Sequence, residues 1–242
     1  MKIPYVNLSK QYLSEKKELL SVISKTLQTG QFVGGGEVKK FEKKICSLLK
    51  VKYCVALNSG TDALTLGLHV LGVRKNDEVI TTSNSFIAST AVIVHLGAKP
   101  VFVDVNPDQC INADLVEKAI TKKTKWIILN SPSNPTGAAY TKKEIINLGN
   151  ILLKNKNILI LSDDIYEHVK FDNFKFFTIA QLKKLKDRTL TMNGVSKAYA
   201  MTGWRIGYAA GPKNIIAAIR KIQSQSTSNP SSISQAAAVE AL

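Results

Sequence analysis

One lysine and one arginine near the end of the chain have the types and spacing of a reactive site. Lys197 lies among small residues in segment 194–208, and Arg205 follows it eight residues later. In a pocket of low polarity a lysine amine loses its proton more easily than in water, where its pKa is roughly 10.4. The neutral amine can attack an aldehyde cofactor, and a guanidinium can hold a phosphate through two hydrogen bonds. We therefore predict that Lys197 is catalytic and that Arg205 binds an anion; the alternatives are a solvated lysine and a surface ion pair.

A carboxylate and a tyrosine form a second candidate pair. Asp163 and Tyr166 lie in segment 162–167, which reads SDDIYE. In a cofactor built on a pyridine ring, a carboxylate that faces the ring nitrogen keeps that nitrogen protonated. The ring can then accept the electrons released when the Cα–H bond of a substrate breaks. We assign this role to Asp163. We predict that Tyr166 forms a hydrogen bond with the phenolic oxygen of the same cofactor ring. The alternative is an aspartate that only caps the next turn, a role that suits Asp164.

An asparagine in a turn supplies a further donor. Asn134 lies in segment 130–137, which reads NSPSNPTG and is a turn by composition. We predict that its amide donates to the same phenolic oxygen. Pro135 can hold this loop in an unusual geometry, such as a cis peptide bond.

A glycine-containing turn near residue 60 is a candidate phosphate site. Gly60 and Thr61 open a predicted helix in segment 59–64, SGTDAL. The first N–H groups of a helix are unpaired, and the helix dipole favours an anion there. Serine and threonine are also ordinary helix caps, so this signal alone is not specific. A dinucleotide-binding enzyme would use a similar turn, but the GxGxxG pattern is absent.

An aromatic residue follows the second predicted strand. At the carboxyl edge of a parallel sheet, Phe86 can stack on a flat ring. It can equally anchor the following helix in the core, and its spacing does not separate these two interpretations.

Short apolar runs alternate with longer helical patterns, and the candidate residues follow the apolar runs. This alternation favours an α/β fold with a mostly parallel, seven-stranded sheet between helices. The predicted strands are 53–57, 78–82, 100–105, 126–130, 158–162, 189–192 and 206–210. The predicted helices are 10–27, 37–49, 61–71, 87–96, 113–120 and 142–155, with two more in 213–242 around a break at 226–232. The chain stops within the last helical pattern, so we expect a truncated protein.

The composition is that of a globular protein and argues against several other classes. The net charge is +15, but the lysines are spread along the whole chain, so we predict no nucleic-acid partner. Without an apolar signal segment or a bilayer-long apolar run, we also predict no membrane partner. Cys46, Cys54 and Cys110 lack metal-site or CxxC spacing. We therefore predict no metal, reduced thiols and a cytoplasmic location.

From about residue 126 onward, the chain resembles the prokaryotic aspartate aminotransferases of class I. The resemblance is carried by segments 130–137, 162–168, 194–208 and 223–230. It implies a fold-type I transferase that binds pyridoxal 5′-phosphate through Lys197. The family roles match those assigned above to Asn134, Asp163, Tyr166 and Arg205.

Residues 1 to about 120 are similar instead to the nucleotide-sugar aminotransferases. This similarity is carried by Ile3-Pro4-Tyr5 and by segments 34–38, 59–64, 77–81 and 100–105. Both families share the cofactor fold, and Gly60, Thr61 and Phe86 match its phosphate-binding and ring-stacking positions. We therefore expect a chimera that joins two related sequences within residues 119–125.

The two resemblances imply a pyridoxal-phosphate-dependent aminotransferase that acts between an amino acid of aspartate or glutamate type and a 2-oxo acid. A nucleotide-sugar aminotransferase and an inactive truncated or chimeric fragment are the alternatives. We expect an N-terminal helical arm at 1–50 and a cofactor-binding domain at 51–242, with the small C-terminal domain largely missing. The resemblance further implies a homodimer with its active site at the interface, and a substrate-binding arginine beyond residue 242.

Overall fold

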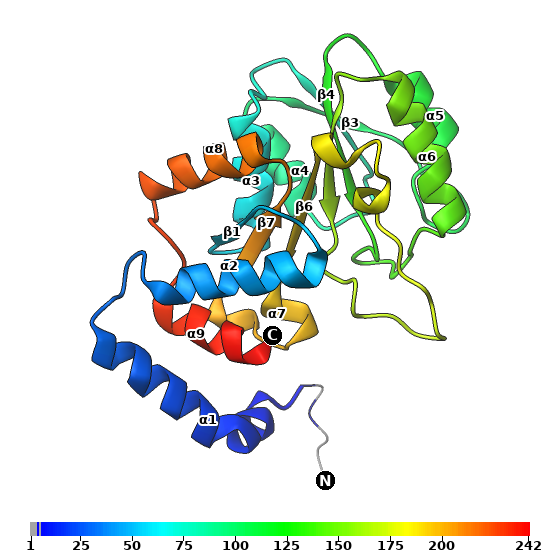
Figure 1. Cartoon of the computed structure of the whole chain (residues 1–242). Coiled ribbons are helices and arrows are strands. Elements are labelled where there is room, and N and C mark those ends of the chain that lie inside the picture. Colours follow the sequence, from blue (N-terminus) through cyan, green and yellow to red (C-terminus); the bar gives the residue numbers. More distant parts are fainter. Residues whose placement is uncertain (1–3, 5) are drawn as a thin grey trace.

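Seven strands form one sheet at the centre of the molecule (Figure 1). The computed structural model describes residue 4 and residues 6–242, so Ile3 and Tyr5 of the N-terminal motif lie outside the described residues. The strands are β1 (Cys54–Leu57), β2 (Glu78–Thr81), β3 (Lys99–Phe102), β4 (Thr124–Asn130), β5 (Leu159–Asp163), β6 (Thr189–Gly194) and β7 (Gly207–Ala210). Each lies at or near a predicted position.

The sheet is parallel except at one strand. Its order is β1-β7-β6-β5-β4-β2-β3, and only β7 pairs antiparallel with its neighbours among the described strands. The predicted α/β fold with a mostly parallel seven-stranded sheet is therefore confirmed. Because β7 runs in the opposite direction, it begins at the edge where the parallel strands end. Its first residue, Gly207, pairs with Leu57 of β1 and Gly194 of β6.

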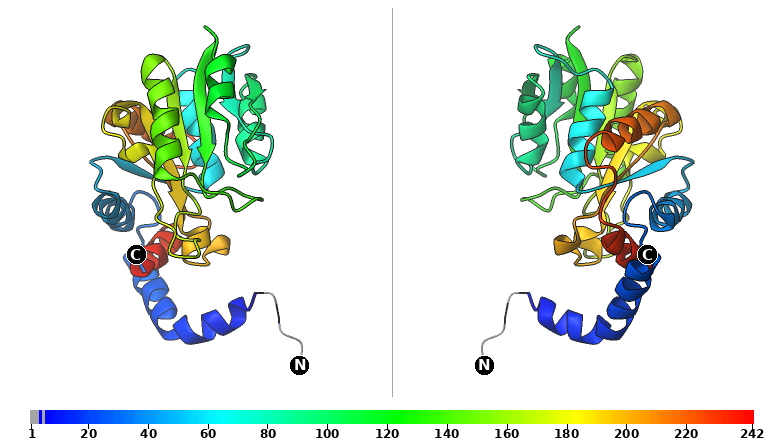
Figure 2. Two further views of the ribbon diagram at one scale, coloured as in Figure 1. Left: turned by 90° about the vertical axis from the view of Figure 1, so that its right-hand side faces the viewer. Right: turned by 90° about the vertical axis from the view of Figure 1, so that its left-hand side faces the viewer.

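Helices cover both faces of the sheet (Figure 2). One face carries α3 (Gly60–Val70), α4 (Ala88–His95) and α8 (Lys213–Ser224); the other carries α5 (Ala113–Ala119), α6 (Lys142–Lys154), α2 (Gly36–Leu49) and α9 (Ser232–Ala241). Strand β4 shows why both faces need cover. Trp126 and Ile128 face the α3 side, whereas Ile127 and Leu129 face the α6 side. A strand segment buried on both faces needs apolar residues at successive positions, as residues 126–129 of β4 have.

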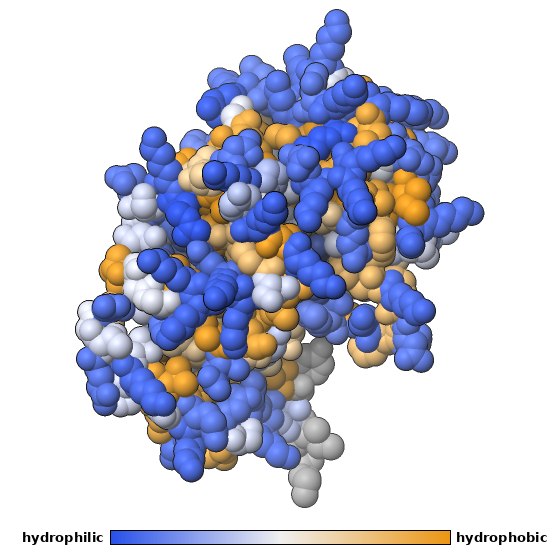
Figure 3. Space-filling view, in the orientation of Figure 1, coloured by the Kyte–Doolittle hydropathy of each residue, from blue (hydrophilic) through white to orange (hydrophobic). Residues whose placement is uncertain are grey.

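The first helix lies apart from the sheet. Helix α1 (Leu8–Thr29) projects from the body and contacts α9 (Figures 1 and 2). The outer side of α2 is hydrophilic (Figure 3), because Lys39, Lys40, Lys43 and Lys44 are all exposed there. In the described part of the chain, we find no helix with both the length and the apolar character needed to cross a membrane.

Strand β3 differs from its prediction, which extended to residue 105. The ladder with β2 ends at Phe102, and Val105 instead forms an isolated antiparallel bridge with Ile111. The remaining elements are single turns: α7 (Val195–Ala198) and the 3₁₀ turns η1 (Ile179–Gln181), η2 (Lys186–Arg188) and η3 (Thr202–Trp204).

Candidate active site

One cavity of about 240 Å³ lies at the carboxyl edge of the sheet. Strand register explains its position. Asn130 pairs with Asp163, which pairs in turn with Met192, so the ends of β4, β5 and β6 are level. The cavity brings together all of the predicted site residues: Gly60, Thr61, Phe86, Asn134, Asp163, Tyr166, Lys197 and Arg205.

The turn between β1 and α3 forms the anion end of this cavity. The Ser59 hydroxyl caps α3 by accepting from the Asp62 N–H at 3.1 Å. The N–H groups of Gly60 and Thr61 have no acceptor among the described residues. A Cβ atom on Gly207 would lie 2.6 Å from the Gly60 nitrogen, so only glycine at position 207 lets β7 approach the turn this closely. The turn thus offers free backbone donors at a helix start, where an anion is favoured.

Arg205 reaches the same end from the start of β7. Its backbone is left-handed, with φ of 56°, and its guanidinium Nη1 donates to the Thr202 carbonyl at 2.9 Å. The Thr202 hydroxyl in turn donates to the Ser196 carbonyl at 3.0 Å. These contacts tie the arginine to the turn that carries Lys197. The side chain of Arg205 remains exposed and has further donors for an anion.

Asp163 forms the buried end of the cavity. Its side chain is 6% exposed and accepts from the Ile165 N–H at 3.2 Å. Burial raises the pKa of this carboxyl to about 7, although hydrogen bonds from Ile165 and Asn130 oppose the shift. A carboxylate held in so dry a place interacts strongly with any cation beside it.

Asp164 points elsewhere, although its burial is similar. It accepts from the Ser162 hydroxyl at 2.7 Å and does not line the cavity. Burial raises its pKa to about 7 as well. The two aspartates are therefore similarly buried, but only the Asp163 side chain lines the cavity.

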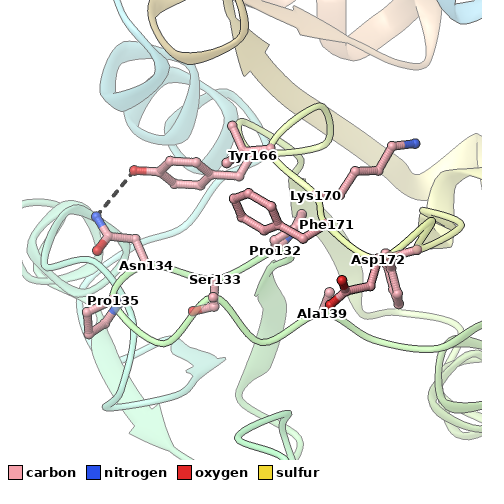
Figure 4. A pocket seen from close by; sticks show the side chains of 12 residues that line it. Pro132, Ser133, Asn134, Pro135, Ala139, Tyr166, Lys170, Phe171 and Asp172 are labelled. Carbon is pink, nitrogen blue, oxygen red and sulfur yellow. Dashed lines mark hydrogen bonds between the residues drawn. The ribbon is translucent and has the colours of Figure 1, made fainter. Parts of the chain in front are cut away.

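Asn134 and Tyr166 meet beside Asp163. The Asn134 amide donates to the Tyr166 hydroxyl at 3.3 Å (Figure 4). The Asn134 N–H donates to the Asn130 side chain at 3.1 Å. The Asn134–Pro135 peptide bond is cis. The side chains of Asn134 and Tyr166 also line a neighbouring cavity of about 550 Å³. The exposed Phe171 lines the same cavity.

Lys197 lies on the single turn α7, directly after β6. Its amine is 5.5 Å from the centre of the Tyr166 ring. The prediction that this amine lies in a pocket of low polarity is wrong, because its side chain is exposed. The reason is that α7 follows the end of β6, and Val195 is the only residue of this turn that is buried in the core.

Phe86 lines the cavity two residues before α4 begins and is 52% exposed. This exposure excludes the interpretation of Phe86 as a core anchor. Its neighbour Ile87 is 68% exposed, whereas Ala88 is buried and connects α4 to the core.

The lining residues that the sequence did not single out include the polar residues Asn130, Ser196 and Thr202. Asn130 carried a usable signal, because it is the last residue of β4 and therefore lies at the carboxyl edge. Ser196 precedes Lys197 at the start of a short helix, and Thr202 acts only through its hydrogen bonds. Nothing in the local sequence distinguishes these two from ordinary polar residues.

The residues present fit pyridoxal 5′-phosphate. The cavity joins unpaired backbone donors and an arginine, suited to a phosphate, to a buried carboxylate that suits a protonated ring nitrogen. An amine lies on the same cavity wall. The sheet is mostly parallel, a turn that caps a helix follows β1, and a lysine follows β6. These features together are those of the fold-type I pyridoxal-phosphate-dependent aminotransferases.

The comparisons with known proteins narrow this class. Residues 9–242 match the family described as aminotransferase class I and II, and the chain belongs to this family. The probable aspartate/prephenate aminotransferase of Rickettsia bellii is 47% identical over 191 residues, which are 78% of this chain and 48% of that protein. The aspartate aminotransferase of Rhizobium meliloti is 47% identical over 192 residues, which are 78% of this chain and 47% of that protein. The chain thus spans about half the length of the curated relatives it matches.

Solved structures agree with this assignment. The aspartate aminotransferase from Rhizobium meliloti superposes with a TM-score of 0.84 and 38% identity, covering 93% of this chain and 59% of that one. The aromatic aminotransferase from Pyrococcus horikoshii superposes with a TM-score of 0.85 and 29% identity, covering 93% and 63%.

Proposed function

We propose that this chain forms the cofactor-binding part of a pyridoxal-phosphate-dependent aminotransferase of aspartate type. It would transfer an amino group between an amino acid of aspartate or glutamate type and a 2-oxo acid. The observation that carries the proposal is the single cavity in which Lys197, Asp163 and the turn at Gly60 meet. The names of the relatives, which are aspartate and aspartate/prephenate aminotransferases, support the substrate class.

Each residue has a role in this proposal. When bound, pyridoxal phosphate supplies an aldehyde and a ring that accepts electrons. The Gly60 and Thr61 N–H groups and Arg205 bind the phosphate, and Phe86 stacks on the ring. Asp163 holds the proton on the ring nitrogen, and Asn134 and Tyr166 donate hydrogen bonds to the phenolic oxygen. Lys197 moves the proton at the substrate Cα.

A spectrum of the purified chain with pyridoxal phosphate tests the cofactor site. We expect a visible absorbance band that Lys197→Ala abolishes and that the matched variant Lys170→Ala retains. Adding aspartate should then convert the band. A wild-type chain with no band contradicts the site, whereas a band that aspartate leaves unchanged supports the alternative of a fragment that binds cofactor without turnover.

A nucleotide-sugar aminotransferase is the second candidate, because of the motifs before residue 120. The presence of Lys197 argues against the dehydratases related to that group, which lack this lysine. Conversion of the band by aspartate with 2-oxoglutarate favours the first candidate, and turnover with a keto-sugar nucleotide favours the second.

We also propose that the chain is a chimera, joined in the loop between α5 and β4. This loop is at the surface, since residues 121–123 are exposed. Amplifying the gene across codons 119–125 from its source tests the idea, and an uninterrupted product of the same sequence excludes a misassembled join.

The wider architecture is part of the same proposal. Residues 1–50 would be a helical arm and residues 51–242 the cofactor domain of a cytoplasmic homodimer whose sites lie at the interface. The exposed amine of Lys197 is consistent with a site that needs further cover. Sedimentation of the chain with and without residues 1–30 tests whether α1 holds two copies together.

A further inference from the structure

Asn130 is a cavity residue to which the proposed function gives no role. It is the last residue of β4, it pairs with Asp163 of β5, and its side chain lines the active-site cavity. It is half-buried, whereas residues 126–129 before it are buried. A polar side chain in this position needs hydrogen-bond partners within the protein, because water reaches only part of it.

The side-chain amide of Asn130 joins two segments of the site. Its Oδ1 accepts from the Asn134 N–H at 3.1 Å, and its Nδ2 donates to the Asp163 carbonyl at 3.2 Å. The oxygen and the nitrogen of an amide are fixed in one plane. The two bonds therefore set the turn that carries Asn134 and the end of β5 relative to each other.

The turn that carries Asn134 is short of main-chain donors. Pro132 and Pro135 have no N–H to donate. The Ser133 N–H donates to the Ala138 carbonyl at 2.8 Å, which closes the turn on itself. The Asn134 N–H instead donates back to the end of β4, so this bond fixes the main chain from which the Asn134 side chain extends.

The second bond of Asn130 holds the peptide group between Asp163 and Asp164. The carbonyl of this group accepts from Asn130 and from the Ser131 N–H, both at 3.2 Å, and its N–H donates to the Met192 carbonyl at 3.0 Å. The peptide group is therefore held by β4 on one side and by β6 on the other. Since Asp163 lines the cavity and Asp164 does not, holding this group helps to fix the direction of the Asp163 carboxyl.

We propose that Asn130 is a positioning residue for the cofactor-binding groups of this site. Its one amide holds the segment of Asn134, to which the proposed function gives the phenolic oxygen, and that of Asp163, to which it gives the ring nitrogen; the inference therefore rests on the proposed function. An aspartate at position 130 can accept from the Asn134 N–H but cannot donate to the Asp163 carbonyl, and an alanine can do neither.

Hydrogen exchange in the cofactor-free chain tests the first bond. The Asn134 amide should exchange more slowly than the Thr136 amide, after correction for intrinsic rates, because the Thr136 N–H has no acceptor among the described residues. Asn130→Ala should speed exchange at Asn134 by about threefold to tenfold, the contribution of one hydrogen bond. Asn130→Asp, which keeps the acceptor, should restore the slow rate. Equal rates at positions 134 and 136 in the wild-type chain overturn the proposal, and this measurement stands even if a variant does not fold.

Exchange at the Asp164 amide tests the second bond. This N–H belongs to the peptide group whose carbonyl accepts from Asn130. It should exchange faster in both Asn130→Ala and Asn130→Asp, because neither side chain can donate to that carbonyl. An unchanged rate in both variants overturns the link to Asp163.

The visible band of bound pyridoxal phosphate tests the link to the cofactor. A donor to the phenolic oxygen stabilises its anionic form, so a misplaced Asn134 amide should raise the pH midpoint of the band. We expect a rise of about half a unit to one unit in Asn130→Ala, which corresponds to one hydrogen bond. An unchanged midpoint overturns the role of Asn130 toward the cofactor.

Asn155→Ala is the matched control. Asn155 is also half-buried, and its Nδ2 donates to the Ile151 carbonyl at 2.9 Å, but it does not line the active-site cavity. This variant should leave exchange at Asn134 and the band midpoint unchanged, and equal effects in both alanine variants overturn the proposal. The exchange measurements need no cofactor. A wild-type chain without a band therefore counts against the proposed function, while the exchange rates still decide whether Asn130 positions the two segments.

Discussion

The buried and the anion ends of the active-site cavity are built in different ways. The buried end comes from the ends of the adjacent parallel strands β4 and β5 and from the loops that follow them, where hydrogen bonds join Asn134 to Asn130 and to Tyr166. The anion end joins residues 60 and 205, which come from distant parts of the chain, and it depends on backbone donors and an exposed arginine. One end therefore works through burial of a charge, whereas the other works through close approach of two backbones.

The largest effect should come from the residue between the two ends. Lys197→Ala should abolish covalent attachment of pyridoxal phosphate while both ends still hold it by non-covalent contacts. Reduction with borohydride followed by mass measurement checks this result. Lys170→Ala, a change of another exposed lysine, is the matched control, and a cofactor still covalently attached without Lys197 would contradict the assignment.

The buried end should make stability depend on pH. Because the folded-state pKa of Asp163 is raised to about 7, the folded chain keeps a proton that the unfolded chain loses above about pH 4. The free energy of unfolding should therefore fall as pH rises from about 4 to 7, by up to roughly 4 kcal/mol for this carboxyl. Asp163→Asn should flatten that slope in urea unfolding measured across this range.

Asp164→Asn is the matched control for this prediction. Burial raises the pKa of Asp164 to about 7 as well, so this variant should flatten the slope similarly. Only Asp163→Asn should also weaken binding of pyridoxal phosphate, because only Asp163 lines the cavity. Equal loss of cofactor affinity in both variants would undermine the role given to Asp163.

The anion end should respond to a single methyl group. In Gly207→Ala the new Cβ would lie 2.6 Å from the Gly60 nitrogen, so the turn must move. We expect a loss of about 1–3 kcal/mol of stability. Affinity for pyridoxal phosphate should weaken with it, as measured by fluorescence titration. Gly203→Ala is the control, since a Cβ there meets no atom within 4 Å; similar losses in both variants would contradict the close-approach argument.

The smallest effect should come from the hydrogen bond at the buried end. Tyr166→Phe removes the acceptor of the Asn134 amide, a contact of 3.3 Å that contributes about 0.5–1.5 kcal/mol. We expect a modest loss of cofactor affinity and a shift of its absorbance band. A loss as large as that of Gly207→Ala would contradict the modest contribution assigned to this hydrogen bond.

Much of the fold could be predicted because its signals are local. The apolar runs at residues 54–57 and 78–81 are strands because turn residues bound them, and the helices between them follow from helical spacing. Residue types also indicated the chemistry, because the segments around Asn134, Asp163 and Lys197 carry their motifs within a few positions. The end of β3 was not predictable in this way, because pairing with β2 rather than residue preference decides where that strand ends.

The sequence alone determined which residues can do chemistry and placed most of them after apolar runs. Only the tertiary structure decided that Gly60 and Arg205 share a cavity, that Asp163 rather than Asp164 faces it, and that Lys197 and Phe86 are exposed. Composition and spacing indicate which residues of one segment are buried, whereas the positions of these residues relative to one another depend on the order of the strands in the sheet. That order results from packing between segments far apart in the chain, which spacing along one segment cannot encode.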